Sequence, residues 1–214
     1  MRSPSPDAGL LRYEGDQLVG EPASNYGGDM DIEFFKRDAV SVAAELLGTR
    51  LLVDGVGGVI VETEAYRLDD EASHSHRGQT LANAAMFGDP ACAYVYRSYG
   101  LHWCLNFVCE TGSAVLIRAL EPSHGIETMV VRRGVVDPRR LCAGPGSVCK
   151  ALGVTRDLDG RPLTGPPFSL RRALVPPVVI SGPRIGISKA IDHPWRFAVA
   201  GSRFLSKPMR PSGG

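Results

Sequence analysis

The sequence lacks the signatures of several large protein classes. It has no apolar run that approaches the length of a membrane span, and no segment with the long apolar centre of a secretory signal. A phosphate-binding P-loop, a GxGxxG motif after a predicted strand and a GxSxG nucleophile motif are also missing. These absences predict a protein without a membrane partner and without the common nucleotide-cofactor or serine-hydrolase sites.

The five cysteines form no recognisable metal site. Cys92, Cys104, Cys109, Cys142 and Cys149 include no CxxC pair, so the spacing does not favour a zinc or iron–sulfur centre. Most of them have apolar neighbours, which is typical of reduced thiols in a cytosolic protein. We therefore expect a cytoplasmic protein that uses no cofactor and no metal.

The charges are unevenly distributed along the chain, although the net charge is only +1. Residues 1–71 hold 6 Lys or Arg and 15 Asp or Glu, a balance of −9, whereas the remaining residues have a balance of +10. Such asymmetry hints at a polyanionic partner. The sequence pI of about 7.7 is lower than the values typical of nucleic-acid binders. The length of 214 residues and the apolar fraction of 43% fit one domain with a sizeable core.

Strand patterns outnumber helix patterns. Residues 1–30 are rich in Ser, Pro, Gly and Asp, which predicts a loose tail or an additional segment. Asp38 can cap a helix from Ala39 to about Leu47, and the turn-rich DGVGG predicts a hairpin between the strands on either side. Strands are predicted over residues 50–53, 59–66, 93–99, 101–109, 113–120, 178–180, 185–187 and from 195; helices are predicted over 125–133 and 145–152, and residues 156–177 are predicted to be irregular. Because the strands connect mostly by short turns, we predict an α+β domain with a largely antiparallel sheet.

The stretch VETEAY, residues 61–66, sets two glutamates and a tyrosine at alternate positions. On a strand, Glu62, Glu64 and Tyr66 share one face, and the three intervening residues share the other. A carboxylate among aromatic neighbours has a raised pKa and can act as a general base near neutral pH. Alternatively, both glutamates lie on the solvated face of an antiparallel sheet, and the residues by themselves favour that interpretation.

The segment HSHRG, residues 74–78, follows the acidic stretch and raises the possibility of a metal-dependent hydrolase that uses Glu62, Glu64, His74 and His76. Two histidines at i and i+2 in a loop point in different directions and match no established zinc spacing. Ordinary hydrogen bonds are the favoured interpretation of these loop histidines.

Aromatic residues concentrate in AYVYRSYGLHW, residues 93–103. Tyr94 and Tyr96 share a strand face, and Tyr94 and Trp103 are expected to join the core. Tyr99 lies near the predicted turn, where there is little core to join. An aromatic at such a tip can wedge between DNA base steps, and aromatic faces can stack on an extruded base.

Two polar residues interrupt apolar strands: Asn106 in CLNFVC and Arg118 in SAVLIRALEP. A buried arginine needs a carboxylate or several hydrogen bonds. Arg118 either forms a structural pair with Glu121 or reaches into a site beside Glu64, and the spacing alone favours the structural pair.

The ordered set of motifs resembles one family over residues 33–206. The segments are FFKRDAVSVAAELLG, VETEAY, DEASHSHRGQT, MFG, YVYRSYGLHWCLN, SAVLIRALEPSHGIETM, LCAGPGSVCKALGV and GPRIGISKAIDHPWRF. They resemble the alkyladenine (3-methyladenine) DNA glycosylases of the type that has neither a helix-hairpin-helix fold nor an iron–sulfur cluster. The expected fold is a single α+β domain over residues 31–206, with a curved, open-barrel-like sheet, short flanking helices and a protruding β-hairpin. A family-divergent segment, residues 1–30, would precede it and a tail, residues 207–214, would follow.

The resemblance also implies roles for individual residues. Glu64 would be the general base that activates water, and Arg118 and the backbone of Ile185 would position that water. The flipped base would lie between aromatic side chains, and the hairpin tip would enter the duplex. The remaining matches are Tyr66, His74 and Tyr96 around the base, Asn106 against normal guanine, Tyr99 as the wedge, and Leu101 beside it.

The function implied by the resemblance is base-excision repair. The enzyme would flip alkylated purines, above all 3-methyladenine, from double-stranded DNA and hydrolyse the N-glycosidic bond, leaving an abasic site. A cationic purine is already a good leaving group and gains from aromatic faces by cation–π attraction. The resemblance therefore implies a monofunctional, metal-free and monomeric glycosylase, cytoplasmic and associated with the nucleoid if the source is bacterial.

The chain departs from the family pattern at three places. Ala82 replaces a usual arginine, Pro90-Ala91 replaces a usual Pro-Gly, and Ser147 stands where a basic residue is common. Two expected phosphate contacts are missing, which bears on the strength and salt dependence of DNA binding. A DNA-binding module that has lost turnover is therefore a second hypothesis. Basic residues that could compensate are Arg132, Arg133, Arg139, Arg140, Arg203, Lys207 and Arg210.

Overall fold

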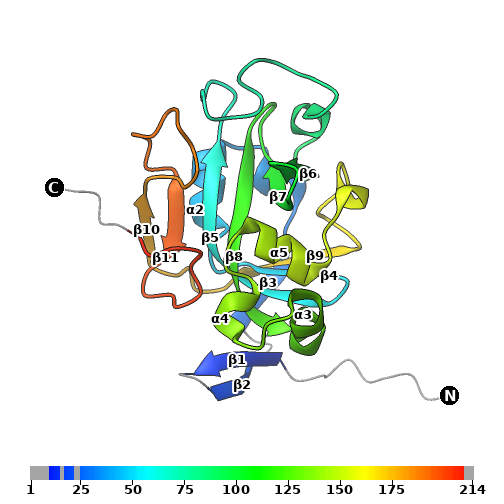
Figure 1. Ribbon diagram of the computed structural model, residues 1–214, viewed down its shortest axis with the longest axis vertical. Helices are drawn as coiled ribbons and strands as arrows, with labels where there is room; N and C mark the ends of the chain where they lie inside the picture. The colour runs from blue at the N-terminus through cyan, green and yellow to red at the C-terminus, as the bar shows by residue number, and fades with distance from the viewer. Residues whose placement is uncertain (1–9, 15–16, 22–24, 210–214) are drawn as a thin grey trace.

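The fold is built on one curved, open antiparallel sheet (Figure 1). The computed structural model describes residues 10–14, 17–21 and 25–209. The sheet has the strand order β3-β9-β4-β5-β8-β7-β6, and β11, which pairs with β5, also carries β10. Every strand pair is antiparallel, which confirms the predicted α+β class. The strands are β1 (Leu10–Glu14), β2 (Gln17–Glu21), β3 (Tyr26–Asp29), β4 (Arg50–Val53), β5 (Val56–Tyr66), β6 (Ala93–Ser98), β7 (His102–Val108), β8 (Ala114–His124), β9 (Phe168–Ala173), β10 (Val179–Gly182) and β11 (Arg196–Val199).

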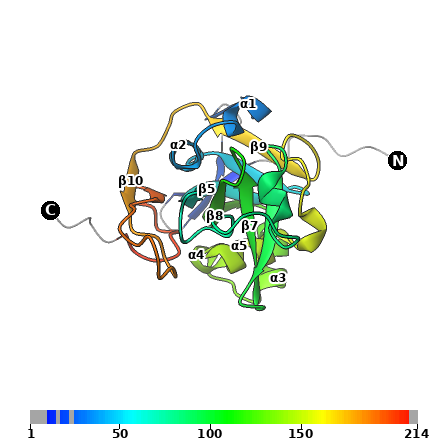
Figure 2. The same cartoon turned by 90° about the horizontal axis from the view of Figure 1, so that it is seen from above.

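Short helices lie around the central strands. In Figure 2, α1 and α2 lie at one side of β5 and β8, and α3, α4 and α5 lie at the other. Asp38 caps α2 as predicted by accepting a hydrogen bond from the Ser41 N–H at 3.3 Å, and Gly153 ends α5 in the left-handed region. The α-helices are α1 (Ile32–Phe35), α2 (Ala39–Glu45), α3 (Ile126–Arg133), α4 (Pro138–Leu141) and α5 (Pro145–Leu152), and the 3₁₀ helices are η2 (Ala84–Phe87) and η3 (Arg156–Leu158). Within the described residues, no helix has the length and apolar character needed to span a membrane.

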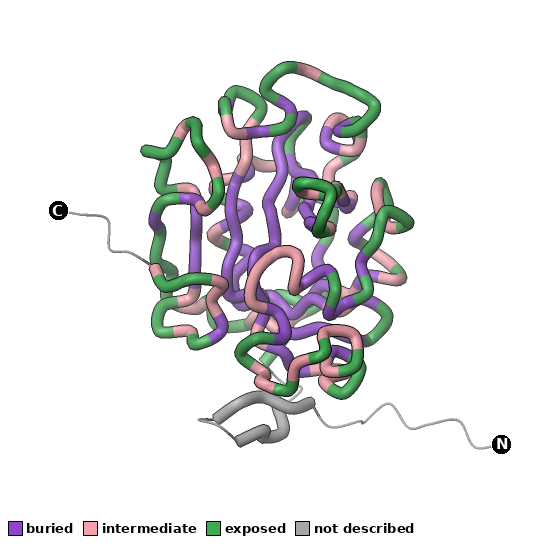
Figure 3. Tube along the Cα trace, in the orientation of Figure 1, coloured by how far each residue is buried: buried purple, intermediate pink, exposed green. Residues whose placement is uncertain are grey.

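The two longest strands, β5 and β8, run side by side through the core (Figure 3). At the start of β5 the neighbouring backbones approach so closely that a Cβ at Gly58 would lie 1.9 Å from the Glu121 carbonyl oxygen. Only glycine fits at that approach, which explains why β5 begins at Val56 and not at the predicted Val59. Gly57 and Gly58 therefore belong to the strand, whereas Gly55 stays in the turn.

Three segments have a different secondary structure from the one predicted. Residues 168–173 belong to the Pro-rich stretch 156–177 that is predicted to be irregular, but they form β9 between β3 and β4. The prolines of this stretch lie on either side of β9, so none of them removes a ladder hydrogen bond. Residues 26–29, predicted to be loose, form the edge strand β3. Residues 185–187, predicted to be a strand, are not one, because the Ile185 N–H donates to a side chain instead of a ladder partner.

Near the N-terminus, β1 and β2 pair with each other as a separate two-stranded sheet. The predictions for residues 1–9, 15–16, 22–24 and 210–214 lie outside the described residues.

The predicted hairpin is formed by β6 and β7 and projects from the body of the protein, with an exposed tip (Figures 2 and 3). The Leu101 N–H donates to the Ser98 carbonyl at 2.9 Å, which closes a turn around Tyr99 and Gly100. Both central residues have positive φ, 49° and 69°. This conformation matches the twist of the flanking strands, but it is unfavourable for an aromatic residue such as Tyr99.

Candidate active site

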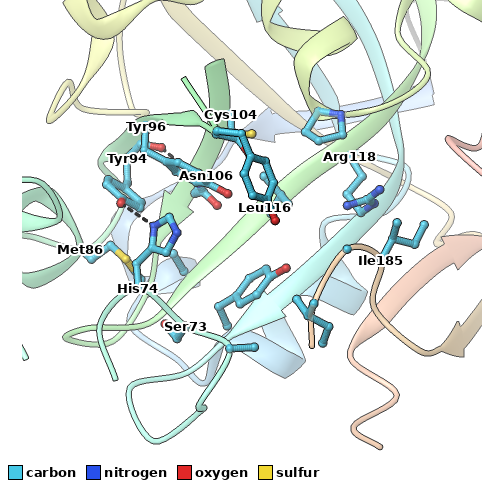
Figure 4. Close-up of a pocket in the computed structure, with 18 of the residues that line it drawn as sticks. Ser73, His74, Met86, Tyr94, Tyr96, Cys104, Asn106, Leu116, Arg118 and Ile185 are labelled. Carbon is cyan, nitrogen blue, oxygen red and sulfur yellow. Dashed lines mark hydrogen bonds between the residues drawn. The ribbon is translucent and has the colours of Figure 1, made fainter. Parts of the chain in front are cut away.

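A cavity of about 620 Å³ opens between the β6–β7 hairpin, β8 and two loops. The first loop follows β5, and the second precedes β11. His74 and Tyr94 lie at one side of the cavity, and Arg118 and Ile185 lie at the opposite side (Figure 4). The cavity therefore combines an aromatic wall with a charged wall, which come from segments far apart in the sequence.

The charged wall is organised around the Glu64 carboxylate, which has no exposed surface. The Ile185 N–H donates to its Oε1 atom at 2.7 Å. The Arg118 Nη1 and the Tyr66 hydroxyl donate to its Oε2 atom at 3.1 Å and 2.9 Å. Both carboxylate oxygens are thus held by groups from three different segments.

Burial raises the pKa of Glu64 above its ordinary value, and the nearby Glu62 charge raises it further. The Arg118 charge and the hydrogen bonds from Ile185 and Tyr66 act in the opposite direction. Burial also raises the pKa of Tyr66 well above its ordinary value. The phenol therefore stays protonated and donates a hydrogen bond to Glu64. The site therefore holds a carboxylate that is more basic than an exposed glutamate.

Two β-bulges aim the charged side chains at each other. Val61 on β5 and Arg118 on β8 have no cross-strand partners, although the residues around them are paired. The Arg118 carbonyl accepts a hydrogen bond from the Gly144 N–H at 3.0 Å instead of a ladder bond. Bulges commonly redirect a side chain beside an active site. Here the Arg118 guanidinium reaches both Glu62 and Glu64.

Two predictions about these residues are wrong. The glutamates do not lie on a solvated face, because both are fully buried. Arg118 forms its ion pairs with Glu62 and Glu64 and not with Glu121. Spacing along β8 favoured Glu121 as the partner, but the neighbouring strand β5 presents two carboxylates to the bulge. The predicted common face of Glu62, Glu64 and Tyr66 is consistent with their contacts.

The aromatic wall is a connected cluster. The His74 Nδ1 and the Tyr94 hydroxyl lie 2.9 Å apart, and the His74 ring meets the Tyr96 ring edge-on at 4.3 Å between centroids. Tyr94 and Tyr96 stack at 5.4 Å, as expected from their shared strand face. Burial lowers the pKa of His74, which favours a neutral imidazole. A neutral ring and stacked phenols suit a flat, electron-poor guest.

Asn106 lies at the floor of the cavity and is 4% exposed. Its Nδ2 donates to the Tyr94 carbonyl at 3.0 Å, which fixes the orientation of the amide. Its cross-strand neighbour is Leu116, which also lines the cavity.

The hairpin tip places two apolar side chains in solvent. Tyr99 is 89% exposed and Leu101 is 72% exposed. Tyr99 also lines the cavity. A second cavity of about 670 Å³ lies between the hairpin and α5, where Ser147, Lys150 and Arg133 line it.

The described part of the chain contains no set of metal ligands that would support the metal-hydrolase hypothesis. No group of three or more His, Cys, Asp or Glu residues there is arranged to hold a metal ion. Glu62 and Glu64 are committed to arginines, and His74 faces Tyr94.

Sequence reasoning missed a buried ion pair that anchors both loops of the cavity. Asp70 in the first loop accepts two hydrogen bonds from Arg184 in the second, and neither side chain is exposed. The Arg184 guanidinium also lies between the Tyr66 and Trp195 rings, 4.7 Å and 5.2 Å from their centroids. The two residues are separated by 114 positions, and no local pattern connects them.

Comparison with known proteins shows the family to which this chain belongs. Residues 33–203 match the sequence profile of the methylpurine-DNA glycosylase (MPG) family. The chain belongs to this family. Its relatives include proteins named provisionally as 3-methyladenine DNA glycosylases. The one from Rhodopseudomonas palustris (strain HaA2) is 57% identical over 83% of this chain and 90% of its own. The one from Rhizobium meliloti (strain 1021) is 59% identical over 83% of this chain and 96% of its own. A third, from Nitrosospira multiformis, is 58% identical over 82% and 93%.

As a methylpurine-DNA glycosylase family member, the chain is a DNA glycosylase that acts on alkylated bases. The cavity at the base of the hairpin is the candidate active site of this glycosylase. Of the basic residues expected to compensate for Ala82 and Ser147, Arg133 lines the second cavity, and Arg210 lies outside the described residues. The roles of the individual site residues stay predictions.

The Asp70–Arg184 pair generates a stability prediction. Asp70→Asn leaves the buried Arg184 charge without its carboxylate, and we expect the free energy of unfolding to fall by about 3–5 kcal/mol. Chemical denaturation followed by circular dichroism measures this change. Asp69→Asn is the matched control, because the exposed Asp69 side chain pairs only at the surface with Arg67, and we expect less than about 1 kcal/mol. Equal effects in the two variants would contradict the anchoring role of the pair.

Proposed function

We propose that the protein excises 3-methyladenine from double-stranded DNA with Glu64 as the general base. The observation that carries the proposal is the buried Glu64 carboxylate, bonded to Arg118 and the Ile185 N–H at one wall of an aromatic cavity. The names of the relatives support the choice of substrate.

In the proposed reaction, Glu64 accepts a proton from water as the water oxygen attacks the C1′ carbon of the sugar. The N-glycosidic bond breaks, and its electron pair goes to the positively charged purine, which leaves as a neutral base. Arg118 and the Ile185 N–H, which would position the water beside the base, also hold the Glu64 carboxylate in a fixed orientation. The carboxylate therefore does not have to reorient during the reaction. The step requires no leaving-group acid, because the alkylated base already carries the charge.

The flipped base would occupy the cavity against Tyr66, His74 and Tyr96. A cationic purine is attracted to aromatic faces, and the lowered pKa of His74 avoids a second positive charge beside it. Asn106 would reject guanine through a clash of its side chain with the exocyclic amine. Tyr99, exposed at the hairpin tip, would fill the gap in the duplex, with Leu101 beside it.

The general-base role is tested by Glu64→Gln, which keeps the shape of the side chain and removes its basicity. We expect the single-turnover rate of 3-methyladenine release from alkylated duplex DNA to fall by about 10²–10⁴-fold. Glu127→Gln, at an exposed position on α3, is the control and should match the wild type. Equal release by wild type and Glu64→Gln would remove Glu64 from the role of base. A wild type that binds abasic DNA tightly but releases no base would instead support the binding-module hypothesis.

The pH dependence follows from the same carboxylate. A base works only when deprotonated, so the rate should fall as the pH drops through the pKa of Glu64. Because that pKa is raised, the loss should occur at higher pH than for an ordinary glutamate. Tyr66→Phe removes a hydrogen bond that lowers the pKa, and should move the acid limb to still higher pH. The measurement is the single-turnover rate across pH with spontaneous release subtracted; an acid limb unmoved by Tyr66→Phe would contradict the assignment.

The wedge role predicts a difference between DNA forms. Tyr99→Ala should slow base release from duplex DNA about tenfold more than release from single-stranded DNA, because only the duplex must be unstacked. Val131→Ala removes an exposed apolar side chain from α3, 83% exposed, and should leave both rates unchanged. A loss that is the same for the two DNA forms would rule out a wedge.

A further inference from the structure

Glu62 has no role in the proposed reaction, although it is the most heavily hydrogen-bonded carboxylate near the cavity. It is fully buried and accepts four hydrogen bonds. Its Oε1 atom receives the Arg118 Nε at 2.9 Å, the Arg196 Nε at 2.8 Å and the Ser206 hydroxyl at 2.7 Å. Its Oε2 atom receives the Ser206 N–H at 2.6 Å.

Ser206 closes a ring of hydrogen bonds with Arg118 and Glu62. Its hydroxyl accepts from the Arg118 Nη2 at 3.2 Å and donates to Glu62, which in turn accepts from the Arg118 Nε. A guanidinium is planar, so fixing Nε and Nη2 also fixes the direction of Nη1. That remaining nitrogen is the one that donates to Glu64.

The segment that carries Ser206 lies after the last strand of the sheet and is held by Arg196 from β11. The Arg196 Nη2 donates to the Lys207 carbonyl, and the Nη1 donates to the Pro208 carbonyl. Arg196 itself is 3% exposed and also pairs with Glu62. The segment is therefore connected to Arg118, which lines the cavity, directly by Ser206 and indirectly by Arg196 and Glu62.

The four buried charges balance each other. Glu62 and Glu64 contribute two negative charges, and Arg118 and Arg196 contribute two positive charges. Glu62 and Ser206 hold the Nε and Nη2 atoms of Arg118. With them, only one of its nitrogens is available to the proposed base.

We propose that Glu62, Arg196 and Ser206 are positioning residues that aim Arg118 at Glu64, so that the segment after β11 takes part in building the active site. This inference rests on the proposed function of Glu64. None of the three residues is expected to touch DNA or the flipped base.

Ser206→Ala tests the inference, because it removes the hydroxyl from the ring and leaves the Ser206 N–H in place. We expect the single-turnover rate of 3-methyladenine release to fall about three- to tenfold, while affinity for duplex DNA containing an abasic analogue stays within about twofold of wild type. Ser206→Thr restores a hydroxyl and should recover most of the rate. Ser202→Ala is the matched control, because Ser202 lies in the same segment and its hydroxyl, among the described residues, accepts only from the Phe204 N–H.

Glu62→Gln gives a second readout that a purely structural role would not move. The Glu62 charge raises the pKa of Glu64, so its removal should shift the acid limb of the rate profile to lower pH. The charged and titratable groups that face Glu64 are otherwise retained in this variant: Arg118, Tyr66, Tyr96 and Cys104.

A wild-type rate in correctly folded Ser206→Ala would overturn the inference, as would an equal loss of rate and DNA affinity. If wild-type protein released no base, the proposed function itself would fail. The network would then be tested without DNA, by nuclear magnetic resonance of the Arg118 Nε–H. Faster hydrogen exchange of that group in Ser206→Ala than in Ser202→Ala supports the ring, and equal exchange overturns it.

Discussion

Two glutamates and two arginines are buried together between β5, β8 and β11, and the candidate active site depends on how they pair. An isolated charge in a protein interior costs several kcal/mol, so each of these side chains requires the others. Arg118 bridges the two carboxylates, and Arg196 completes the charge balance through Glu62. Removing one member would leave a buried charge unpaired. The stability of the core and the geometry of the cavity therefore depend on the same four side chains.

The backbone makes this pairing possible through irregularity. A regular antiparallel pair of strands would give Arg118 a cross-strand partner and keep its carbonyl in the ladder. The bulges at Val61 and Arg118 remove that pairing, and the loop before α5 supplies the replacement bond from Gly144. The same loop begins the helix that packs on β7 and β8, and the second cavity lies against that helix. The hydrogen bond lost from the β5–β8 ladder at Arg118 is thus replaced by one from the loop before α5. The same helix packs against both the hairpin strand β7 and the strand β8 that carries Arg118.

Local signals were sufficient for part of this arrangement and insufficient for the rest. Asp38 before α2 and Gly153 after α5 act on adjacent backbone groups, so the sequence reveals them directly. The alternation in VETEAY likewise indicates a shared face. In contrast, the hydrogen bond between Arg118 and Glu62 joins residues 56 positions apart, and the one between Glu62 and Ser206 joins residues 144 positions apart. Such contacts depend on strand order and bulges, neither of which produces a periodic pattern in the sequence. Motif resemblance selected Glu64 as the base, but it assigned nothing to Glu62.

The two carboxylates of VETEAY illustrate how one strand face can hold residues with opposite requirements. A general base must stay basic, so its carboxylate cannot be neutralised completely by bound donors. A structural carboxylate in a dry core must be neutralised as fully as possible. Glu62 accepts four hydrogen bonds and contacts two arginines, whereas Glu64 accepts three hydrogen bonds and contacts a single arginine. Burial raises the pKa of Glu64, and the single arginine that contacts it offsets this effect only in part. The unequal division of two arginines between two glutamates therefore suits the proposed role of Glu64 as a base inside a stable core.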